Sequence, residues 1–339
     1  MSRNREAVRA AVVGAGSWGT AIATLLHRNG HEVALWTFEE EVVESIRREG
    51  ENRVYLPGVP ISPGIRVSHR VEDVVSGASV VVSVSPAQHV GRVMAEAALH
   101  LSPDAIVVSA SKGIETDSLR TMDEVLAPLL PPGRTEALVI LSGPSFAIEV
   151  AQGQPTAVVA ASRSPEAMLR IRDVFLSPSF RVYTNPDVIG VELAGAVKNV
   201  VALAAGVLAG LDLGYNTQAA LMTRGLAEMS RLGVAMGADP ATFAGLAGLG
   251  DLVLTCTGPL SRNRSVGVRL GRGEPLDEIL REMRSVAEGV RTAPAVRALA
   301  HRHGVDMPIV EQVCGILQGD RSPADAVREL MLRDPKAEA

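Results

Sequence analysis

Lys198 is the residue whose surroundings point most directly to chemistry. It lies in the longest apolar run of the chain, residues 188–211, and its neighbours at helical spacings are small and apolar. Burying an ammonium group on such a face is costly unless a carboxylate or a ligand offsets the lost hydration, and desolvation lowers the pKa of a lysine. We therefore expect Lys198 to act as a proton donor. The alternative is a structural ion pair with Glu192 or with a more distant acid.

Two later stretches could complete a site for an anionic substrate. Residues 246–251 are expected to form a glycine-rich turn that presents the carboxylate of Asp251, which either pairs with Lys198 or caps a helix. Residues 261–264 have the sequence Ser-Arg-Asn-Arg and combine hydroxyl, guanidinium and amide groups. Such a set suits a phosphate dianion through charge-assisted hydrogen bonds, and a solvated loop is an equal alternative.

Lys112 and the turn at residues 142–147 follow two of three apolar runs, at residues 78–84, 105–109 and 137–141. These runs are typical of parallel strands that are covered on both faces. Ligands bind beyond the carboxyl ends of such strands. We therefore expect Lys112 to contact a ligand and the turn to present backbone N–H groups to an anion. A solvated lysine on a loop is the alternative for Lys112.

Residues 8–36 predict a strand, a glycine turn, a helix and a second strand in unbroken succession. Gly14, Gly16 and Gly19 form the pattern GxGxxG, in which the glycines allow a tight turn, backbone approach to a pyrophosphate and close packing of helix and strand. The helix is expected to begin at Ser17, with its free N–H groups facing the diphosphate. This segment predicts dinucleotide binding, and an ordinary glycine-rich βαβ turn is the alternative.

The stretch after the second strand should face the adenosine ribose of a cofactor. Phe38 supplies no charge there, and Glu39, Glu40 and Glu41 follow it directly. Because a carboxylate suits a free 2′-hydroxyl and repels a 2′-phosphate, we expect NADH to be preferred over NADPH. Glu40 and Glu41 could instead stabilise the first turn of the next helix. Three arginines could fold back and neutralise the pocket, namely Arg47, Arg48 and Arg53.

Composition excludes several classes of protein. The chain has 339 residues, a net charge of −5 and no basic run longer than two residues, which argues against a nucleic-acid surface. Its two cysteines, Cys256 and Cys314, are too few for a disulfide framework and indicate a reducing cytoplasm. The seven histidines show no metal-ligand spacing, so no metal is expected. Charged and polar residues interrupt the run at 188–211, which favours a buried helix over a membrane span.

The order of the predicted elements indicates the fold class. Strands and helices alternate in the first half, and residues 276–333 show amphipathic helical patterns only. We predict an α/β protein with an N-terminal Rossmann-type doubly wound sheet followed by an all-α C-terminal domain. The expected domains are residues 1–188 for the dinucleotide and residues 189–335 for the substrate. Residues 55–64, rich in proline and glycine, are expected to form an irregular loop.

Seven motifs, taken in order, resemble the NAD(P)-dependent glycerol-3-phosphate dehydrogenase family in its bacterial form. They are GAGSWGTA from Gly14, SKGIE from Ser111, SGPSFA from Ser142, GAVKN from Gly195, TRGLAEMSRLG from Thr223, GLGDLVLTCTG from Gly248 and SRNR from Ser261. The resemblance implies interconversion of dihydroxyacetone phosphate and sn-glycerol 3-phosphate by hydride transfer with NAD(P)H, supplying glycerol 3-phosphate for phospholipid synthesis. It also implies a homodimer.

The resemblance assigns roles to individual residues. Lys198 is implied as the proton donor and acceptor at the substrate oxygen, with Lys112 and Asp251 as further catalytic residues. The implied substrate contacts are Lys112, Gly143, Ser145, Lys198, Asp251, Ser261, Arg262 and Asn263. The implied cofactor contacts are Gly14, Gly16, Ser17, Trp18, Gly19, Phe38, Lys112, Ala147, Arg262, Val286 and Glu288.

One departure from the bacterial pattern concerns the cofactor. Many bacterial members carry His or Arg where this chain has Phe38, whereas Phe38-Glu39-Glu40 is similar to the eukaryotic NAD-linked enzymes. NAD(H) is therefore the expected cofactor, with NADP(H) as a second candidate. The alternatives for the activity are a 6-phosphogluconate or 3-hydroxyacid type of dehydrogenase, or a non-catalytic protein that senses NAD(H). A sensor would need neither a buried lysine nor a phosphate-binding segment.

Overall fold

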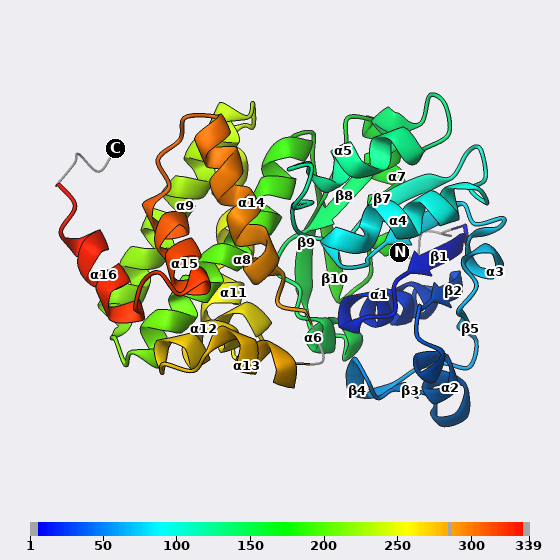
Figure 1. The fold of residues 1–339 in the computed structure, drawn as a ribbon. Helices are drawn as coiled ribbons and strands as arrows, with labels where there is room; N and C mark the ends of the chain where they lie inside the picture. Colours follow the sequence, from blue (N-terminus) through cyan, green and yellow to red (C-terminus); the bar gives the residue numbers. More distant parts are fainter. Residues whose placement is uncertain (1–5, 284–285, 335–339) are drawn as a thin grey trace. The chain divides into compact units, whose positions relative to one another are not determined.

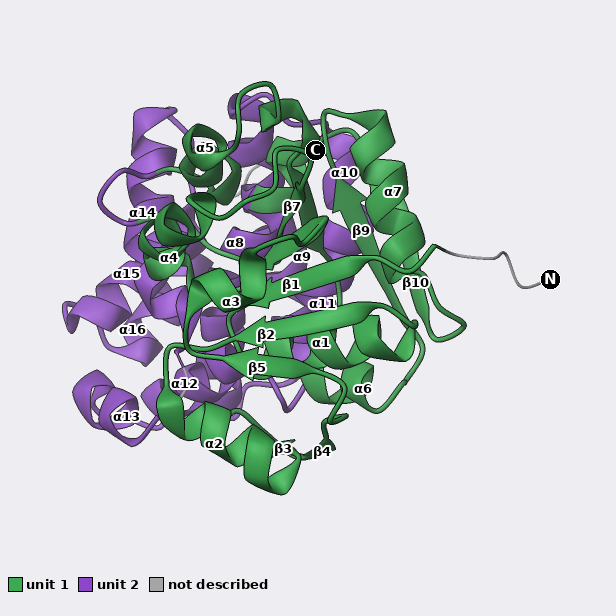
Figure 2. Ribbon diagram, turned by 90° about the vertical axis from the view of Figure 1, so that its right-hand side faces the viewer, with its two compact units in different colours: residues 1–115, 120–192 green, residues 116–119, 193–339 purple. Residues whose placement is uncertain are grey.

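The computed structural model describes residues 6–283 and 286–334. The chain divides into two compact units, coloured separately in Figure 2. The first comprises Met1–Glu115 and Arg120–Glu192, and the second comprises Thr116–Leu119 and Leu193–Ala339. The structure thus divides the chain after Glu192, inside a helix, whereas the sequence places the domain boundary at residue 188.

An eight-stranded sheet forms the centre of the first unit, in the order β10-β9-β8-β7-β6-β1-β2-β5 (Figures 1 and 2). Its strands are β1 (Arg9–Val13), β2 (Glu32–Trp36), β5 (Arg66–Ser68), β6 (Val80–Ser83), β7 (Ile106–Ser109), β8 (Val139–Ser142), β9 (Thr156–Ala161) and β10 (Phe180–Asn185). All neighbouring strands are parallel except β8 and β9. The order β5-β2-β1-β6-β7-β8 is that of a doubly wound dinucleotide fold, so the predicted α/β class is confirmed.

Helices cover both faces of this sheet, which is why its central strands are apolar without alternation. The helices are α1 (Ser17–Arg28), α2 (Glu40–Glu49), α3 (Val71–Val75), α4 (Ala87–Ala98), α5 (Met122–Leu126), α6 (Ala147–Ala151) and α7 (Pro165–Phe175), with short 3₁₀ turns η1 (Ala127–Leu129) and η2 (Thr135–Ala137). α1 packs with α6 and α7, and α4 packs with α3 and α5. The glycine turn, Phe38 and Lys112 follow the carboxyl ends of β1, β2 and β7, the edge at which such sheets bind ligands.

The proline-rich segment after α2 forms a strand, so the expectation of an irregular loop over residues 55–64 is wrong for its first half. β4 (Leu56–Pro60) pairs antiparallel with β3 (Glu51–Asn52). A proline lacks the N–H group that a central strand needs, but both strands of a two-stranded ribbon are edges and tolerate it. The prolines of this segment argue against a central strand but not against a strand at an edge.

The second unit is helical, as predicted. Its helices are α8 (Val188–Gly210), which begins in the first unit, α9 (Tyr215–Ala235), α10 (Pro240–Phe243), α11 (Asp251–Thr257), α12 (Arg262–Gly271), α13 (Leu276–Glu282), α14 (Glu288–Arg302), α15 (Pro308–Gln318) and α16 (Pro323–Met331). Within residues 246–251, expected as a glycine-rich turn, Leu246–Gly250 form a π-helical turn, η3, that runs directly into α11. The glycines permit this wide turn without side-chain crowding.

Two stretches of the second unit are long and apolar enough to cross a membrane by length and composition alone. α8 is one of them, and 94% of its most apolar window is buried inside the protein, which confirms the predicted buried helix. The other, Pro240–Thr257, is 44% buried and consists of three short helical pieces. The hydropathy of α8 therefore reflects its place in the core.

Paired glycines bring α8 and α12 into backbone contact. Gly206 and Gly210 on α8 face Gly267 and Gly271 on α12. A Cβ atom on Gly267 would lie only 2.1 Å from the carbonyl oxygen of Leu203 and 2.9 Å from the Cα atom of Gly206. These two helices also carry the candidate catalytic lysine and the Ser-Arg-Asn-Arg segment. The glycines therefore set the spacing between two parts of the candidate site.

We expect Gly267→Ala to destabilise the protein by about 1–3 kcal/mol, because the added methyl group meets backbone that cannot rotate away. Chemical denaturation of the variant beside the wild type measures the effect. Gly214→Ala is the matched control, since its added Cβ would meet no atom of the described chain within 4 Å beyond its own neighbours in sequence. Equal stability of the two variants would show that the close helix contact is not required.

Glu228 is a buried carboxylate in the helical unit, on α9. Its Oε1 and Oε2 atoms accept hydrogen bonds from the backbone N–H groups of Ile309 (2.8 Å) and Val310 (3.4 Å) at the start of α15. Burial nevertheless raises the pKa of Glu228 from 4.5 to about 7. Because the folded state binds this proton more tightly than the unfolded state, its contribution to stability is full below pH 4.5 and is lost as the pH rises through about 7.

The variant Glu228→Gln keeps the size of the side chain and one acceptor but cannot ionise. The free energy of unfolding of the wild type, relative to this variant, should therefore fall by about 1–3 kcal/mol between about pH 5 and about pH 8. Urea denaturation of both proteins at the two pH values measures this difference. A difference that stays constant with pH would contradict the assignment.

Candidate active site

The glycine turn between β1 and α1 has the geometry of a dinucleotide cradle. Gly14 adopts a φ of +126°, and its Cβ atom would lie 3.0 Å from the backbone of Val84. A Cβ atom on Gly19 would lie 1.8 Å from the carbonyl oxygen of Gly14, so the helix and the turn need both glycines. At Gly16 the described chain leaves open space, and no described side chain caps α1. A diphosphate fits this exposed helix N-terminus.

The hairpin of β3 and β4 fixes this turn. The buried side chain of Asn52 donates to the carbonyl oxygen of Ala15 (2.8 Å) and to the hydroxyl of Thr20 (2.9 Å). Ser17 donates its hydroxyl to the carbonyl oxygen of Tyr55 (2.5 Å). The hydroxyl of Ser17 is therefore engaged within the protein, and its backbone N–H group is the part that suits a phosphate. Sequence reasoning missed the role of Asn52, which depends on a contact between distant parts of the chain.

Phe38 follows β2, and its side chain is 69% exposed beyond the carboxyl end of that strand. Glu39 is held by two hydrogen bonds, accepted at Oε1 from the Tyr55 hydroxyl and at Oε2 from the Thr37 hydroxyl, both at 2.8 Å. Glu40 and Glu41 lie in the first turn of α2, which confirms the helix-stabilising alternative for these two. Only Glu39 thus remains as a candidate ribose ligand.

Lys112, Gly143 and Ser145 come together at the ends of β7 and β8. The carbonyl oxygen of Gly143 accepts hydrogen bonds from Lys112 Nζ and from Ser145 Oγ, each at 3.0 Å. Gly143 has a φ of +130°, and a Cβ atom there would lie 3.0 Å from the Cα atom of Val158. Ala147 opens α6 just after this turn. The structure therefore joins the three residues that the sequence placed at two separate strand ends.

In the helical unit, Lys198 and Asp251 form a buried ion pair. Lys198 Nζ donates to Asp251 Oδ1 at 2.5 Å and to Thr255 Oγ1 at 2.9 Å, and the Thr255 hydroxyl donates to the Asp251 carbonyl oxygen at 2.6 Å. The side chains are 8% and 1% exposed for Lys198 and Asp251. Asp251 is also the first residue of α11, so it is both the predicted partner and a helix-start residue.

Glu192, the alternative partner of Lys198, is engaged elsewhere. It lies in the first unit, where its Oε1 atom accepts a hydrogen bond from the backbone N–H group of Asp123 at 3.0 Å. Burial and the neighbouring Asp123 carboxylate raise the pKa of Glu192 well above its usual range. Glu192 is thus bonded to Asp123, whereas Lys198 Nζ donates to Asp251, which is its partner.

Asn263 links three helices, and its partner in α8 is Asn199, the residue after Lys198. Asn263 Nδ2 in α12 donates to Asn199 Oδ1 in α8, and Asn263 Oδ1 accepts from the backbone N–H group of Gly289 at the start of α14, both at 2.9 Å. Ser261 caps α12 by accepting from the Arg264 N–H group at 3.2 Å. The Ser-Arg-Asn-Arg segment is thus the start of a helix, and the alternative of a solvated loop is wrong.

The remaining predicted site residues of the helical unit lie at or just before the first residues of α12 and α14. Arg262 is an exposed residue in the first position of α12, and Glu288 is the first residue of α14. Val286 precedes Glu288 and is 43% exposed. Asn199 received no role from the sequence, although it is the last residue of the GAVKN motif. Its adjacency to Lys198 was the available signal for a role in the site.

The two cysteines belong to the core. Both are free and buried, and burial raises the pKa of the Cys256 thiol to about 12 and that of Cys314 to about 11. Both thiols therefore remain protonated near neutral pH, although Cys256 lies in α11 with Asp251. A thiolate nucleophile is not available from either residue.

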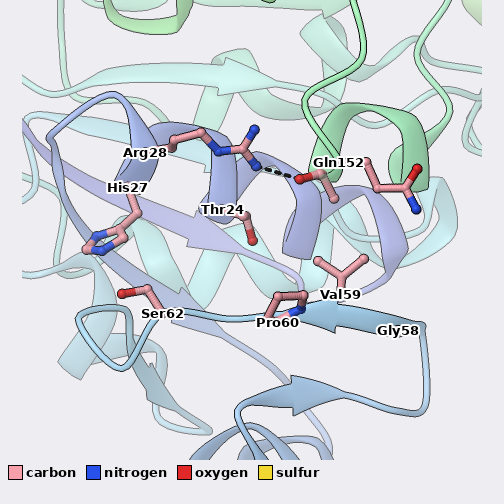
Figure 3. Close-up of a pocket in the computed structure, with 9 residues that line it drawn as sticks. Thr24, His27, Arg28, Gly58, Val59, Pro60, Ser62 and Gln152 are labelled. Carbon is pink, nitrogen blue, oxygen red and sulfur yellow. Dashed lines mark hydrogen bonds between the residues drawn. The ribbon is translucent and has the colours of Figure 1, made fainter.

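A pocket of about 370 Å³ lies in the first unit at the C-terminal end of α1, opposite to the end that follows the glycine turn (Figure 3). Arg28 borders it and donates to the carbonyl oxygen of Ala151 at 2.5 Å. Its lining residues are Thr24, His27, Arg28, Gly58, Val59, Pro60, Ser62, Ala151 and Gln152. None of the predicted site residues lines this pocket, so it is separate from the glycine turn.

Two family models match the chain. The N-terminal model of NAD-dependent glycerol-3-phosphate dehydrogenase covers residues 9–168, and the C-terminal model covers residues 187–328. A glycerol-3-phosphate dehydrogenase [NAD(P)+] from Geobacter metallireducens is 57% identical over 96% of this chain and 98% of its own length.

Solved structures agree with this match. The glycerol-3-phosphate dehydrogenase of Coxiella burnetii superposes with a TM-score of 0.91 at 39% identity, covering 96% of this chain and 99% of the other. That of Saccharomyces cerevisiae has a TM-score of 0.81 at 27% identity, with coverages of 97% and 100%. With both halves matched by family models and the fold shared over nearly its whole length, the chain belongs to the NAD-dependent glycerol-3-phosphate dehydrogenase family.

Proposed function

We propose that the protein interconverts dihydroxyacetone phosphate and sn-glycerol 3-phosphate, with NAD(P)(H) as the hydride carrier. The observation that carries this proposal is the buried Lys198–Asp251 pair, whose neighbour Asn199 is bonded to the first turn of α12. Relatives more than half identical to this chain are named glycerol-3-phosphate dehydrogenase [NAD(P)+]. The product serves as the backbone precursor for phospholipids.

The first unit has the residues to hold the dinucleotide. The turn at Gly14, Gly16 and Gly19, with the open N-terminus of α1, suits the diphosphate, and Phe38 suits the adenosine end. When bound, the nicotinamide supplies or accepts the hydride. Lys112, on the same unit, adds a cation at the carboxyl end of β7.

Lys198 handles the proton. When a ketone carbon is reduced, negative charge grows on its oxygen, and an ammonium group positioned there stabilises that charge and protonates it. In the opposite direction the neutral amine removes the proton from the alcohol. Asp251 and Thr255 hold Nζ in place, and the negative charge of Asp251 compensates for the burial of the lysine.

Ser261, Arg262 and Asn263 would bind the substrate phosphate. The guanidinium group of Arg262 can donate two parallel hydrogen bonds to phosphate oxygens. Asn263 is fixed by its bonds to Asn199 and Gly289, which orients the first turn of α12. A cation next to backbone N–H groups at a helix start is well suited to a dianion.

Absorbance at the NADH band tests the function. Mixing the protein with NADH and dihydroxyacetone phosphate should consume NADH, whereas a protein that only senses NAD(H) would bind it without oxidising it. Oxidation of 6-phosphogluconate or of a 3-hydroxy acid, with no reaction of dihydroxyacetone phosphate, would replace the proposed substrate by that of another dehydrogenase.

We further propose that the protein works as a homodimer in the cytoplasm. The family resemblance supports the dimer, and the two buried, unpaired cysteines support a reducing compartment. Light scattering coupled to gel filtration gives the mass in solution, and a mass of about 36 kDa at micromolar concentration, that of a single 35.6 kDa chain, would contradict the dimer.

The variant Lys198→Ala should lower turnover by about 10²-fold or more, because a positioned acid and its electrostatic effect are both lost. The affinity for NADH, measured by fluorescence, should change little. Since Asp251 would be left as an unpaired buried charge, the double variant Lys198→Met/Asp251→Asn provides a folded control that is inactive for the same reason. Near-normal turnover of either variant would reject the assignment.

The variant Arg262→Ala should raise KM for dihydroxyacetone phosphate by about tenfold or more, because a charge-assisted contact to phosphate is lost. Activity towards free dihydroxyacetone should be nearly unchanged. Arg272→Ala, at the opposite end of α12, is the matched control for a lost positive charge. If Arg262→Ala affected both substrates equally, Arg262 would not bind the phosphate.

A further inference from the structure

The helix that carries Lys198 begins in the first unit. α8 runs without interruption over Val188–Gly210, and its residues up to Glu192 belong to the first unit, whereas the rest belong to the second. Lys198 follows Glu192 by less than two helical turns, about 9 Å along the helix axis. Because a continuous helix is stiff over this length, the start of α8 sets the direction in which the lysine helix leaves the first unit.

The side chain of Glu192 is bonded back into the first unit. The residue is buried, and its Oε1 atom accepts a hydrogen bond from the backbone N–H group of Asp123 at 3.0 Å. Asp123 is itself held on both carboxylate oxygens, which accept from the Thr121 hydroxyl at 2.6 Å and from the guanidinium group of Arg163 at 2.9 Å. Glu192 thus ties the start of α8 to the start of α5.

The other passage of the chain between the units ends at the same short helix. Thr116–Leu119 belong to the second unit, and Glu115 and Arg120 on either side belong to the first. The Glu115 N–H group donates to the carbonyl oxygen of Arg120 at 2.9 Å, and the two side chains form an ion pair at 3.2 Å. Thr121 follows at once and forms the capping box of α5. Both passages are therefore fastened next to the first residues of α5.

This anchoring bears on the reaction proposed above. There the first unit holds the nicotinamide and Lys198 of the second unit transfers the proton, so both groups must be held in register. A misplacement of about 1 Å can lower turnover by about 10²-fold. We propose that Glu192 is a positioning residue: by tying α8 to the start of α5, it keeps Lys198 where proton transfer requires it. The inference rests on the proposed function.

Three variants separate positioning from stability. Glu192→Leu removes the acceptor of the Asp123 N–H group, whereas Glu192→Gln keeps an acceptor oxygen on a side chain of the same length. Ile171→Val, at a fully buried position of α7, is the control for a general loss of stability. For each protein, kcat and KM for dihydroxyacetone phosphate are measured below the unfolding transition, together with the Kd of NADH by fluorescence.

We expect Glu192→Leu to lower kcat by about tenfold or more, while the Kd of NADH changes less than about threefold, because the glycine turn is untouched. Glu192→Gln should restore kcat to within about threefold of the wild type, and Ile171→Val should leave it unchanged. A merely structural role would not lower the turnover of folded protein at constant NADH affinity.

A second measurement does not depend on activity. Spin labels are attached to cysteines introduced at Glu166 on α7 and at Arg302 on α14, which are exposed residues of the first and the second unit. The native Cys256 and Cys314 are buried and should stay unlabelled. Pulsed electron paramagnetic resonance then gives the distribution of label distances. It should broaden in Glu192→Leu and keep the wild-type width in Glu192→Gln.

Either near-normal kcat or an unchanged distance distribution in Glu192→Leu would overturn the proposal. A parallel loss of kcat and of NADH affinity, or an equal loss of kcat in Ile171→Val, would reduce Glu192 to a stabilising residue. Wild-type protein that fails to oxidise NADH with dihydroxyacetone phosphate would refute the proposed function instead, and the label distances would still decide whether Glu192 fixes the start of α8.

Discussion

The helical unit depends on a pair of opposite charges placed where hydrophobic burial would otherwise exclude them. Lys198 and Asp251 are both nearly inaccessible to solvent, and either alone would carry the full penalty of an unpaired buried ion, about 3–5 kcal/mol. The pairing therefore constrains α8 and α11 to one arrangement. It also places the ammonium group in an environment with little water, where electrostatic effects are strong, as the proposed proton transfer would require.

Backbone contact through glycine appears in both units and serves the same end. In the first unit, glycines let α1 approach the turn that follows β1, which leaves the helix N-terminus open for a diphosphate. In the second, glycines let α8 and α12 touch, which ties the lysine helix to the helix that begins with Arg262. Glycine is needed at these positions because an added Cβ atom would collide with the neighbouring backbone.

Polar side chains then fix the loops that glycine leaves free. Asn52 anchors the glycine turn through the carbonyl oxygen of Ala15, and Asn263 joins the starts of α12 and α14 through Asn199 and Gly289. Both side chains are buried, and each donates from its amide nitrogen and accepts at its amide oxygen. They act as positioning residues, since they hold ligand-facing segments in place through bonds within the protein.

The sequence alone determined the fold class, the dinucleotide turn and the buried helix around Lys198, because hydrophobic periodicity and glycine spacing are local properties. It offered Asp251 as one of two partners for Lys198, and the fold decided between them. The sequence did not determine the strand at residues 56–60 or the helical state of residues 246–250. These depend on which strands are neighbours and on which edges are free. Such long-range relations arise only when the chain is folded, and so the tertiary structure decided them.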